Sequence, residues 1–404
     1  MAMDIGDKLA LADKNWIGDN YYTKDELNGD GVLVPKTPYG LIWDQLADTY
    51  NRTGDADFTQ VQREMKRCVL NGDGSVNYFL DPEDSTLKAD GTDAVLDGTD
   101  GNVMVQIPKF WYKYNYNTSD GEQHEHSISS VAADGYTIHP AFIISGVEVD
   151  FRYFGAYQGS KSGDTLVSVS GQYPWCNETI TEFRTAAELN GSDWRQVDFL
   201  LYEAITLLMM VEYGTMNIQL ALGNGRTMLS GGLWEDGSYY GISGLSNSLG
   251  NASGHNSYAG DADDAAADFA FMSYRGCENF YGNVWTFADG VLFEDNVPYI
   301  NQYPATYDST ARTAEDVNTG ITMTASDGYA TKLAGSGQGF FPTAVAGNSS
   351  IGTTDYFYAN DAGELGIALV GGHADNVLAA GPLYLTGGNV ASSVAVSIGA
   401  GVAR

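Results

Sequence analysis

The segment YRGCENFYGNVWTFADG, residues 274–290, carries more structural information than any other part of this chain. Trp285 and Phe287 are two residues apart, so in a strand their side chains point to the same face of the sheet. Gly276 and Gly282 lie where the backbone must turn or approach another segment closely. The segment therefore predicts a structural core built on Trp285 and Phe287, with Gly282 as a required small residue.

The composition indicates a turn-rich β protein with a substantial core. Of the 404 residues, 43% are hydrophobic and 18% are charged, and there are 49 glycines, 26 tyrosines and 16 phenylalanines. Aromatic residues are enriched in strands, and glycine is enriched in turns. A chain of this length commonly holds more than one domain.

The charge of the chain argues against two classes of partner. There are 20 lysine and arginine residues against 52 aspartate and glutamate residues, which gives a formal net charge of −32. Nucleic acids and anionic membranes attract basic surfaces, so we expect no nucleic-acid binding and no membrane insertion. The cysteines Cys68, Cys176 and Cys277 are far apart, which predicts neither a disulfide framework nor a structural zinc site.

One segment predicts a long helix. Trp194–Tyr213 follows a capping pair, Ser192-Asp193, and contains few helix breakers. Its centre at 199–211 is apolar almost all round, so we expect this helix to be buried against a twisted sheet. The tail at 365–404 contains only two formal charges, which predicts that it is packed in a sheet or covered by a partner.

Several motifs, in order along the chain, resemble a known family. GNVWTF at 282–287 resembles the Gly-Asn-Val-Trp-Glu-Trp signature of the C-type-lectin-like fold, which formylglycine-generating enzymes share with variable bacteriophage tail adhesins. Segment 103–114 resembles a strand of phage tail proteins, and 139–159 resembles the opening strands of the lectin-like domain. Segment 194–225 resembles the main helix of that domain, and 371–404 resembles its terminal motifs.

The resemblance implies an α+β fold class in two parts. Residues 1–125 would form a β-rich N-terminal attachment or assembly region. Residues 135–404 would form a C-type-lectin-like domain with a twisted antiparallel sheet and a buried central helix. The polar segment at 117–137 is the expected domain junction.

The sequence departs from the enzymes of this family in two ways. No cysteine follows Cys277, whereas the enzymes use a C-terminal cysteine pair for oxidation, so we expect no enzymatic activity. The family calcium site would include Asn279, but its carboxylate position is occupied by Thr286. Calcium prefers charged oxygen ligands, so the resemblance implies at most a weak calcium site at Asn279 and no required cofactor.

The resemblance also implies where a ligand would bind. In phage proteins of this family, the C-terminal region forms the exposed ligand-binding face. By position, the predicted ligand-binding residues are Asp375, Asn376, Leu378, Ala379, Tyr384, Leu385 and Asn389. Alternation in a strand would turn about half of them inward. Tyr384 is the strongest candidate, because tyrosine combines a rigid surface with a hydroxyl, and we expect Tyr384→Ala to weaken binding without changing stability.

These expectations lead to a function in a virus particle. The resemblance implies a phage virion adhesin, a tail-fibre or tail-tip protein that binds a host-surface ligand, either a glycan or a protein. The chain would be exposed on the virion after assembly in the host cytoplasm, as a homotrimer whose several copies increase avidity. The alternative is a structural virion protein of the baseplate, collar or capsid surface that binds other virion proteins.

Overall fold

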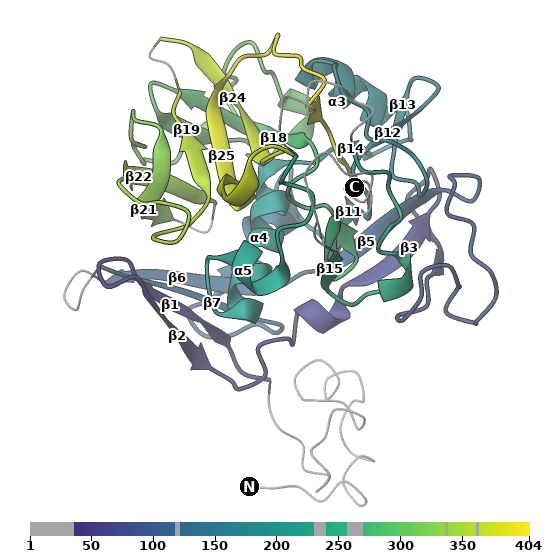
Figure 1. Ribbon diagram of the computed structural model, residues 1–404, viewed down its shortest axis with the longest axis horizontal. Coiled ribbons are helices and arrows are strands. Elements are labelled where there is room, and N and C mark those ends of the chain that lie inside the picture. Colours follow the sequence, from purple (N-terminus) through teal and green to yellow (C-terminus); the bar gives the residue numbers. More distant parts are fainter. Residues whose placement is uncertain (1–35, 118–121, 230–239, 257–269, 336–337, 361–362) are drawn as a thin grey trace, which may run out of the picture.

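Strands form most of the regular structure in the computed structural model, which describes residues 36–117, 122–229, 240–256, 270–335, 338–360 and 363–404 (Figure 1). Strands make up 37% of the structure and helices 13%. The α-helices among the described residues are α3 (Ile180–Glu188), α4 (Phe199–Tyr213) and α5 (Ile218–Leu222). The predicted α+β class with a C-type-lectin-like domain is therefore wrong, and the chain is a mostly β protein with a curled sheet.

The strand content exceeds the prediction because residues next to the long helix form strand, and because turns divide much of the remaining chain into short strands. The buried helix is present as α4, but it begins at Phe199 and not at Trp194. Arg195–Gln196 instead forms the short strand β14, which pairs with the last strand of the chain. Asp198 caps the helix by accepting the Leu201 N–H at 3.0 Å. Elsewhere, glycine and aspartate turns break the chain into short strands.

The largest sheet has nine strands and carries the C-terminal part of the chain (Figure 1). Its order along the sheet is β20 (Val317–Asn318), β19 (Val297–Ile300), β18 (Trp285–Glu294), β24 (Leu365–Gly371), β25 (Gly381–Asn389), β23 (Tyr356–Tyr358), β21 (Gly328–Gly335) and β22 (Phe340–Val345). β26 (Ile398–Gly399) pairs in parallel with β18. Much of the nearly uncharged tail at 365–404 thus lies in the sheet, which confirms the first of the two alternatives predicted for it.

Two further sheets complete the main framework. The five-stranded sheet has the order β2 (Thr49–Gly54), β1 (Tyr39–Asp44), β7 (Gln123–Ser129), β6 (Trp111–Asn117) and β8 (Thr137–Ile138). The six-stranded sheet has the order β14, β27 (Val402–Ala403), β11 (Phe151–Gly155), β5 (Asn102–Pro108), β3 (Lys66–Leu70) and β4 (Val76–Phe79). Short hairpins pair β9 (Ile143–Ile144) with β10 (Val147–Glu148) and β12 (Ser160–Ser162) with β13 (Thr165–Val167).

The remaining elements are short. A three-stranded sheet consists of β15 (Gly254–Asn256), β16 (Phe271–Tyr274) and β17 (Cys277–Glu278). The 3-10 helices are η2 (Gln62–Glu64), η3 (Pro140–Phe142), η6 (Asn247–Leu249), η8 (Pro304–Thr306) and η9 (Val377–Ala379).

Strand pairing joins the two sides of the predicted domain junction. Phe154 of β11 lies opposite Val105 of β5 on one side and Ala403 of β27 on the other. In the five-stranded sheet, β1 pairs with β7, which continues beyond residue 125. The division into domains at 1–125 and 135–404 stays a prediction, but hydrogen-bonded sheets cross it.

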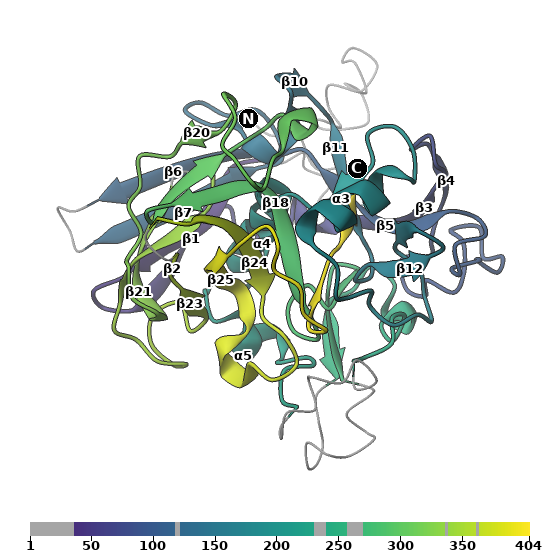
Figure 2. The ribbon, with the colours of Figure 1, turned by 90° about the horizontal axis from the view of Figure 1, so that it is seen from above.

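Helix α4 lies at the centre of the molecule in both views (Figures 1 and 2). It contacts β1 and β7 of the five-stranded sheet, β18 of the nine-stranded sheet, and η3. Its residues from Phe199 to Val211 are all buried, which is what an apolar helix surface requires in water. The helix therefore fixes the nine-stranded sheet relative to the N-terminal strands.

The segment at 274–290 is placed at the edge of this core. Phe287 is fully buried, and Trp285 is half-buried against the same apolar cluster. Gly282 has a φ of 78°, and a Cβ there would lie 2.8 Å from the Arg226 carbonyl oxygen. Its N–H donates to the Gly371 carbonyl at 3.1 Å, so the turn before β18 is held against the end of β24.

The carboxyl of Glu203 generates a prediction about pH. Glu203 lies on α4 and accepts the Phe340 N–H at 3.2 Å, beside a small cavity that His126 and His139 also line. Burial raises the pKa of Glu203 from 4.5 to about 8, and burial lowers the pKa of both imidazoles to about 3, so all three groups are uncharged in the folded protein near pH 7.

We expect Glu203→Gln to be more stable than wild type at pH 7 by up to about 3 kcal/mol. A carboxyl whose folded pKa is raised contributes its full stability below pH about 4.5 and loses it as the pH rises to about 8. The difference in melting temperature should therefore grow between pH 5 and pH 8. The exposed Glu188→Gln serves as control, and parallel pH profiles for Glu203→Gln and wild type would contradict the placement.

Candidate functional site

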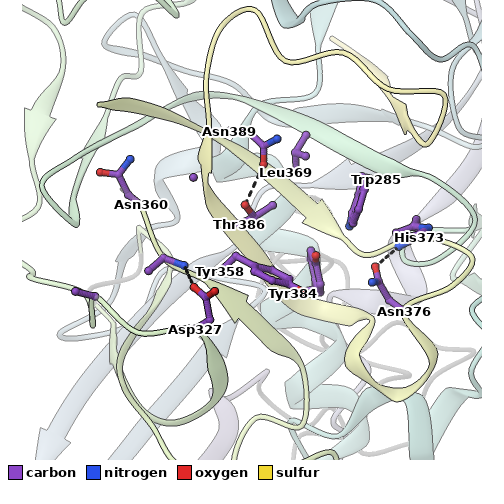
Figure 3. A pocket seen from close by; sticks show the side chains of 13 residues that line it. Trp285, Asp327, Tyr358, Asn360, Leu369, His373, Asn376, Tyr384, Thr386 and Asn389 are labelled. Atoms are coloured by element: carbon purple, nitrogen blue, oxygen red, sulfur yellow. Dashed lines mark hydrogen bonds between the residues drawn. The ribbon is translucent and has the colours of Figure 1, made fainter. Parts of the chain in front are cut away.

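A pocket of about 700 Å³ lies on the nine-stranded sheet (Figure 3). Its strand residues are Trp285 of β18, Leu369 of β24, Tyr384, Thr386, Gly388 and Asn389 of β25, and Tyr358 of β23. Its other residues are Ala325, Asp327, Ala359, Asn360, His373 and Asn376. The volume falls within the range of about 300–1,000 Å³ that is typical of small-molecule sites.

Strand register brings the pocket residues together from distant parts of the chain. Thr386 of β25 lies opposite Leu369 of β24 and Tyr358 of β23. The pairing of β24 with β25 is irregular at two points, between Ile367 and Leu369 and between Val370 and Gly371. Irregularities of this kind bend a strand and re-aim its side chains, which helps to hollow the sheet here.

Aromatic rings form a continuous row through the pocket. The ring of Trp285 lies 3.9 Å from that of His373 and 6.5 Å from that of Tyr384, measured between centroids. Tyr384 in turn lies 6.1 Å from Tyr358. Aromatic rings offer large rigid surfaces whose faces carry partial negative charge. The row therefore provides apolar contact area in a pocket whose other groups are mostly polar.

Three buried polar atoms in the lining have no hydrogen-bond partner among the described residues. They are the hydroxyl of Tyr384, the indole Nε1 of Trp285 and the amide Oδ1 of Asn360. Burial raises the pKa of the Tyr384 hydroxyl, and the Trp285 indole partly opposes this rise, although the two groups do not reach hydrogen-bond geometry. Buried polar groups are almost always bonded, so these three atoms mark where a water, or a ligand after a shift of the lining side chains, would supply the missing bond.

The loop between β24 and β25 is held in a strained shape at one end of the pocket. Val377 has a φ of 53°, which a β-branched residue seldom adopts. Its N–H donates to the Thr227 carbonyl at 2.7 Å, and its carbonyl accepts from Gln219 Nε2 at 3.1 Å. The His373 N–H donates to Asn376 Oδ1 at 2.7 Å. Strain that the surroundings maintain is common at binding sites.

The other end of the pocket is fixed by amide and carboxylate groups. Asp327 Oδ1 accepts the Ala359 N–H at 2.8 Å. Asn360 Nδ2 donates to the carbonyls of Glu364 and Gly387, and these two bonds define which end of the amide is the oxygen. The Asp327 carboxylate is the only formal charge in the described lining, because burial lowers the pKa of His373 to about 4 and leaves it neutral.

The structure brings three of the seven predicted ligand-binding residues into this pocket, namely Asn376, Tyr384 and Asn389. Leu385 points to the other face and is buried in the main core. Asp375 and Ala379 are half-buried and Leu378 is 40% exposed, and none of these three lines the pocket.

Sequence reasoning missed several lining residues. Trp285 packs against an apolar cluster, as predicted, but it also forms a wall of the pocket, which was not predicted. Tyr358, Asp327 and Asn360 belong to segments that no motif singled out. The alternating tyrosines at 356 and 358 were the available signal, since they mark one face of a strand.

Asn279 has a structural role. Its side-chain Oδ1 accepts the Met272 N–H at 3.4 Å, and the residue is 4% exposed. No group of three or more His, Cys, Asp or Glu side chains within the described ranges is placed to hold a metal ion. The weak calcium site at Asn279 stays a prediction.

The aspartates of many loops stabilise turns. In nine places among the described residues, an Asp side chain accepts the backbone N–H of the residue two positions later. Five of the pairs are Asp73 with Ser75, Asp84 with Thr86, Asp90 with Thr92, Asp97 with Thr99, and Asp308 with Thr310. Part of the acidic character of the chain thus follows from turn formation.

A scan against protein-family models gave no match for this chain, and a search of curated proteins gave none either. Among the helices that the structure describes, none is both long enough and apolar enough to cross a membrane. The pocket on the nine-stranded sheet is therefore the main basis for an argument about function.

The burial of Tyr384 changes the expectation for its replacement. The side chain is only 1% exposed, so Tyr384→Ala should lower the free energy of unfolding by about 3–5 kcal/mol. Tyr384→Phe should leave it within about 1 kcal/mol of wild type, because the lost hydroxyl has no partner among the described residues. Urea denaturation measures both changes. Equal losses for the two variants would show that the hydroxyl stabilises the fold.

Proposed function

We propose that this chain is a virion protein of a bacteriophage that attaches the particle to its host, and that it binds a host-surface ligand without chemical change. The observation that supports this proposal is the 700 Å³ pocket, which joins an aromatic row to buried polar atoms that lack partners among the described residues. The resemblance of segment 103–114 to a strand of phage tail proteins is the second support.

The chemistry of the lining favours binding over catalysis. Within the described lining there is no serine, cysteine or lysine, and its only hydroxyl groups belong to Thr386, Tyr358 and Tyr384. The Thr386 hydroxyl donates to Asn389 Oδ1 at 3.0 Å, and an amide oxygen does not act as a general base. A nucleophile normally requires a base within hydrogen-bond reach. We therefore propose a binding protein that needs no cofactor.

Several copies of the chain would make such a pocket effective. Copies of a site arranged on one particle raise the effective concentration of the remaining sites once the first has bound. We propose the homotrimer that the resemblance to phage tail proteins implies. Its acidic surface, with a net charge of −32, would also limit nonspecific adhesion to anionic cell envelopes.

Adhesion to whole cells tests the proposed function. Fluorescently labelled protein, incubated with a panel of bacterial strains, should adhere saturably to a subset of strains. Asn389→Ala, which alters a pocket residue, should reduce that adhesion about tenfold through loss of an amide contact.

The matched control is Asn318→Ala, an exposed asparagine on β20 at the far edge of the same sheet, which should adhere as the wild type does. Adhesion to no strain, together with binding to phage particles that lack the protein, would favour the structural virion role instead. Equal adhesion by the wild type, Asn389→Ala and Asn318→Ala would show that adhesion does not depend on the pocket.

A further inference from the structure

We propose that the pocket binds a neutral saccharide, a short stretch of an uncharged glycan, with a sugar ring against Tyr358 and Trp285 and with its hydroxyls bonded to the amide groups at the two ends. This inference rests on the proposed attachment function and specifies the ligand class for the same pocket. Three features of the lining carry it, which are its charge, its aromatic surface and its arrangement of polar groups.

The charge of the lining disfavours an anionic ligand. Neither lysine nor arginine occurs in the described lining, and Asp327 supplies a negative charge. Sialic acids, phosphorylated sugars and carboxylate side chains need cationic or clustered N–H donors to offset their charge. The net charge of −32 adds a long-range repulsion for the same ligands. A neutral ligand avoids both penalties.

The aromatic surface suits a sugar ring. Tyr358 is 40% exposed, so much of its ring is open to a ligand, and Trp285 is half-buried on the other side of Tyr384. One face of a pyranose consists largely of C–H groups with partial positive charge, and these pack on the electron-rich face of an aromatic ring. The aromatic row can therefore bind a molecule that is polar at its edges.

The polar groups are divided between two ends of the pocket. Figure 3 shows Asp327 and Asn360 at one end and His373 and Asn376 at the other, with Tyr384 between them. An amide offers both a donor and an acceptor, as a sugar hydroxyl does. The Asn360 Oδ1 atom is an acceptor without a partner among the described residues. Polar groups spread over two ends of the pocket suit a ligand with several hydroxyls, such as a saccharide, better than a ligand with one charged group.

A peptide strand fits the site less well. Extended peptides are commonly bound by addition to a free sheet edge. β24 lies between β18 and β25, and β25 lies between β24 and β23, so the strands that floor the pocket are paired on both sides. The pocket is thus on the face of the sheet, where a peptide backbone finds no ladder of free N–H and C=O groups.

Titration of the full-length protein with glycans tests the ligand class. The probes are neutral disaccharides of glucose, galactose, mannose and N-acetylglucosamine, purified neutral surface polysaccharides from the strains that the protein binds, and sialyllactose and mannose 6-phosphate as anionic comparisons. We expect saturable binding of at least one neutral probe and no measurable binding of the anionic ones.

Replacing two tyrosines of nearly equal exposure, one in the pocket and one outside it, tests whether the ligand binds in the pocket or elsewhere on the surface. Tyr358→Ala should weaken binding of the neutral probe about tenfold, through loss of the ring contact. Tyr303→Ala should leave binding unchanged, since Tyr303 is 38% exposed and lies outside the pocket lining. Equal effects of the two variants would overturn the assignment, provided that both melt as the wild type does.

The variant Asp327→Asn tests whether the ligand is neutral or anionic. It keeps an oxygen that can accept the Ala359 N–H but removes the negative charge. A neutral sugar should bind the variant no better than wild type, whereas an anionic ligand should bind it several-fold better. Tighter binding of an anionic probe than of every neutral probe to the wild-type protein, with Asp327 still charged, would overturn the proposal.

Treated cells distinguish failure of the ligand class from failure of the attachment function. Periodate cleaves vicinal diols and so destroys most surface glycans, and we expect it to abolish adhesion. Adhesion that survives periodate but is lost after protease treatment would overturn the saccharide and leave the attachment function standing. If the protein adheres to no untreated strain, both the saccharide ligand and the attachment function are contradicted.

Discussion

The fold depends on the buried carboxylate of Asp198. It caps α4 and pairs with the guanidinium of Arg152 on β11, and both side chains are almost completely buried. Arg152 also donates to the Ala141 carbonyl at 2.6 Å, which ties η3 to the same point. Next to the cap, the Val197 carbonyl accepts the Asp289 N–H at 2.9 Å and so attaches β18. Removing one member of a buried ion pair typically costs about 3–5 kcal/mol, so helix α4, the six-stranded sheet and the nine-stranded sheet share one costly connection.

Local patterns predicted the elements that depend on local chemistry. An unbroken apolar run predicted the buried α4, and the spacing of Trp285 and Phe287 placed both against one apolar cluster. The overall class was not predictable in this way. It depends on pairings such as that of β27 with β11 and β14, which join residues hundreds of positions apart through backbone groups that all sequences share.

The candidate site was predictable only in its C-terminal half. Position along the chain pointed to Asn376, Tyr384 and Asn389, and alternation indicated that about half of the predicted residues would turn inward, as Leu385 does. The remaining half comes from β23 and its flanking loops, through a parallel pairing of β23 with β25. Nothing near Tyr358 in the sequence encodes that neighbour, so its role appears only when the sheet is assembled.

The two ends of the pocket belong to separate stretches of chain with separate anchors. The loop that carries His373 and Asn376 is held by Thr227 and Gln219, whereas Asn360 is held by Glu364 and Gly387. The four anchoring residues differ between the two ends, so a substitution at one end leaves these bonds of the other end in place. In the attachment protein that we propose, such an arrangement would be evolvable, because recognition of a new receptor could arise by exchanging one half of the contacts while the other half retains affinity during the transition.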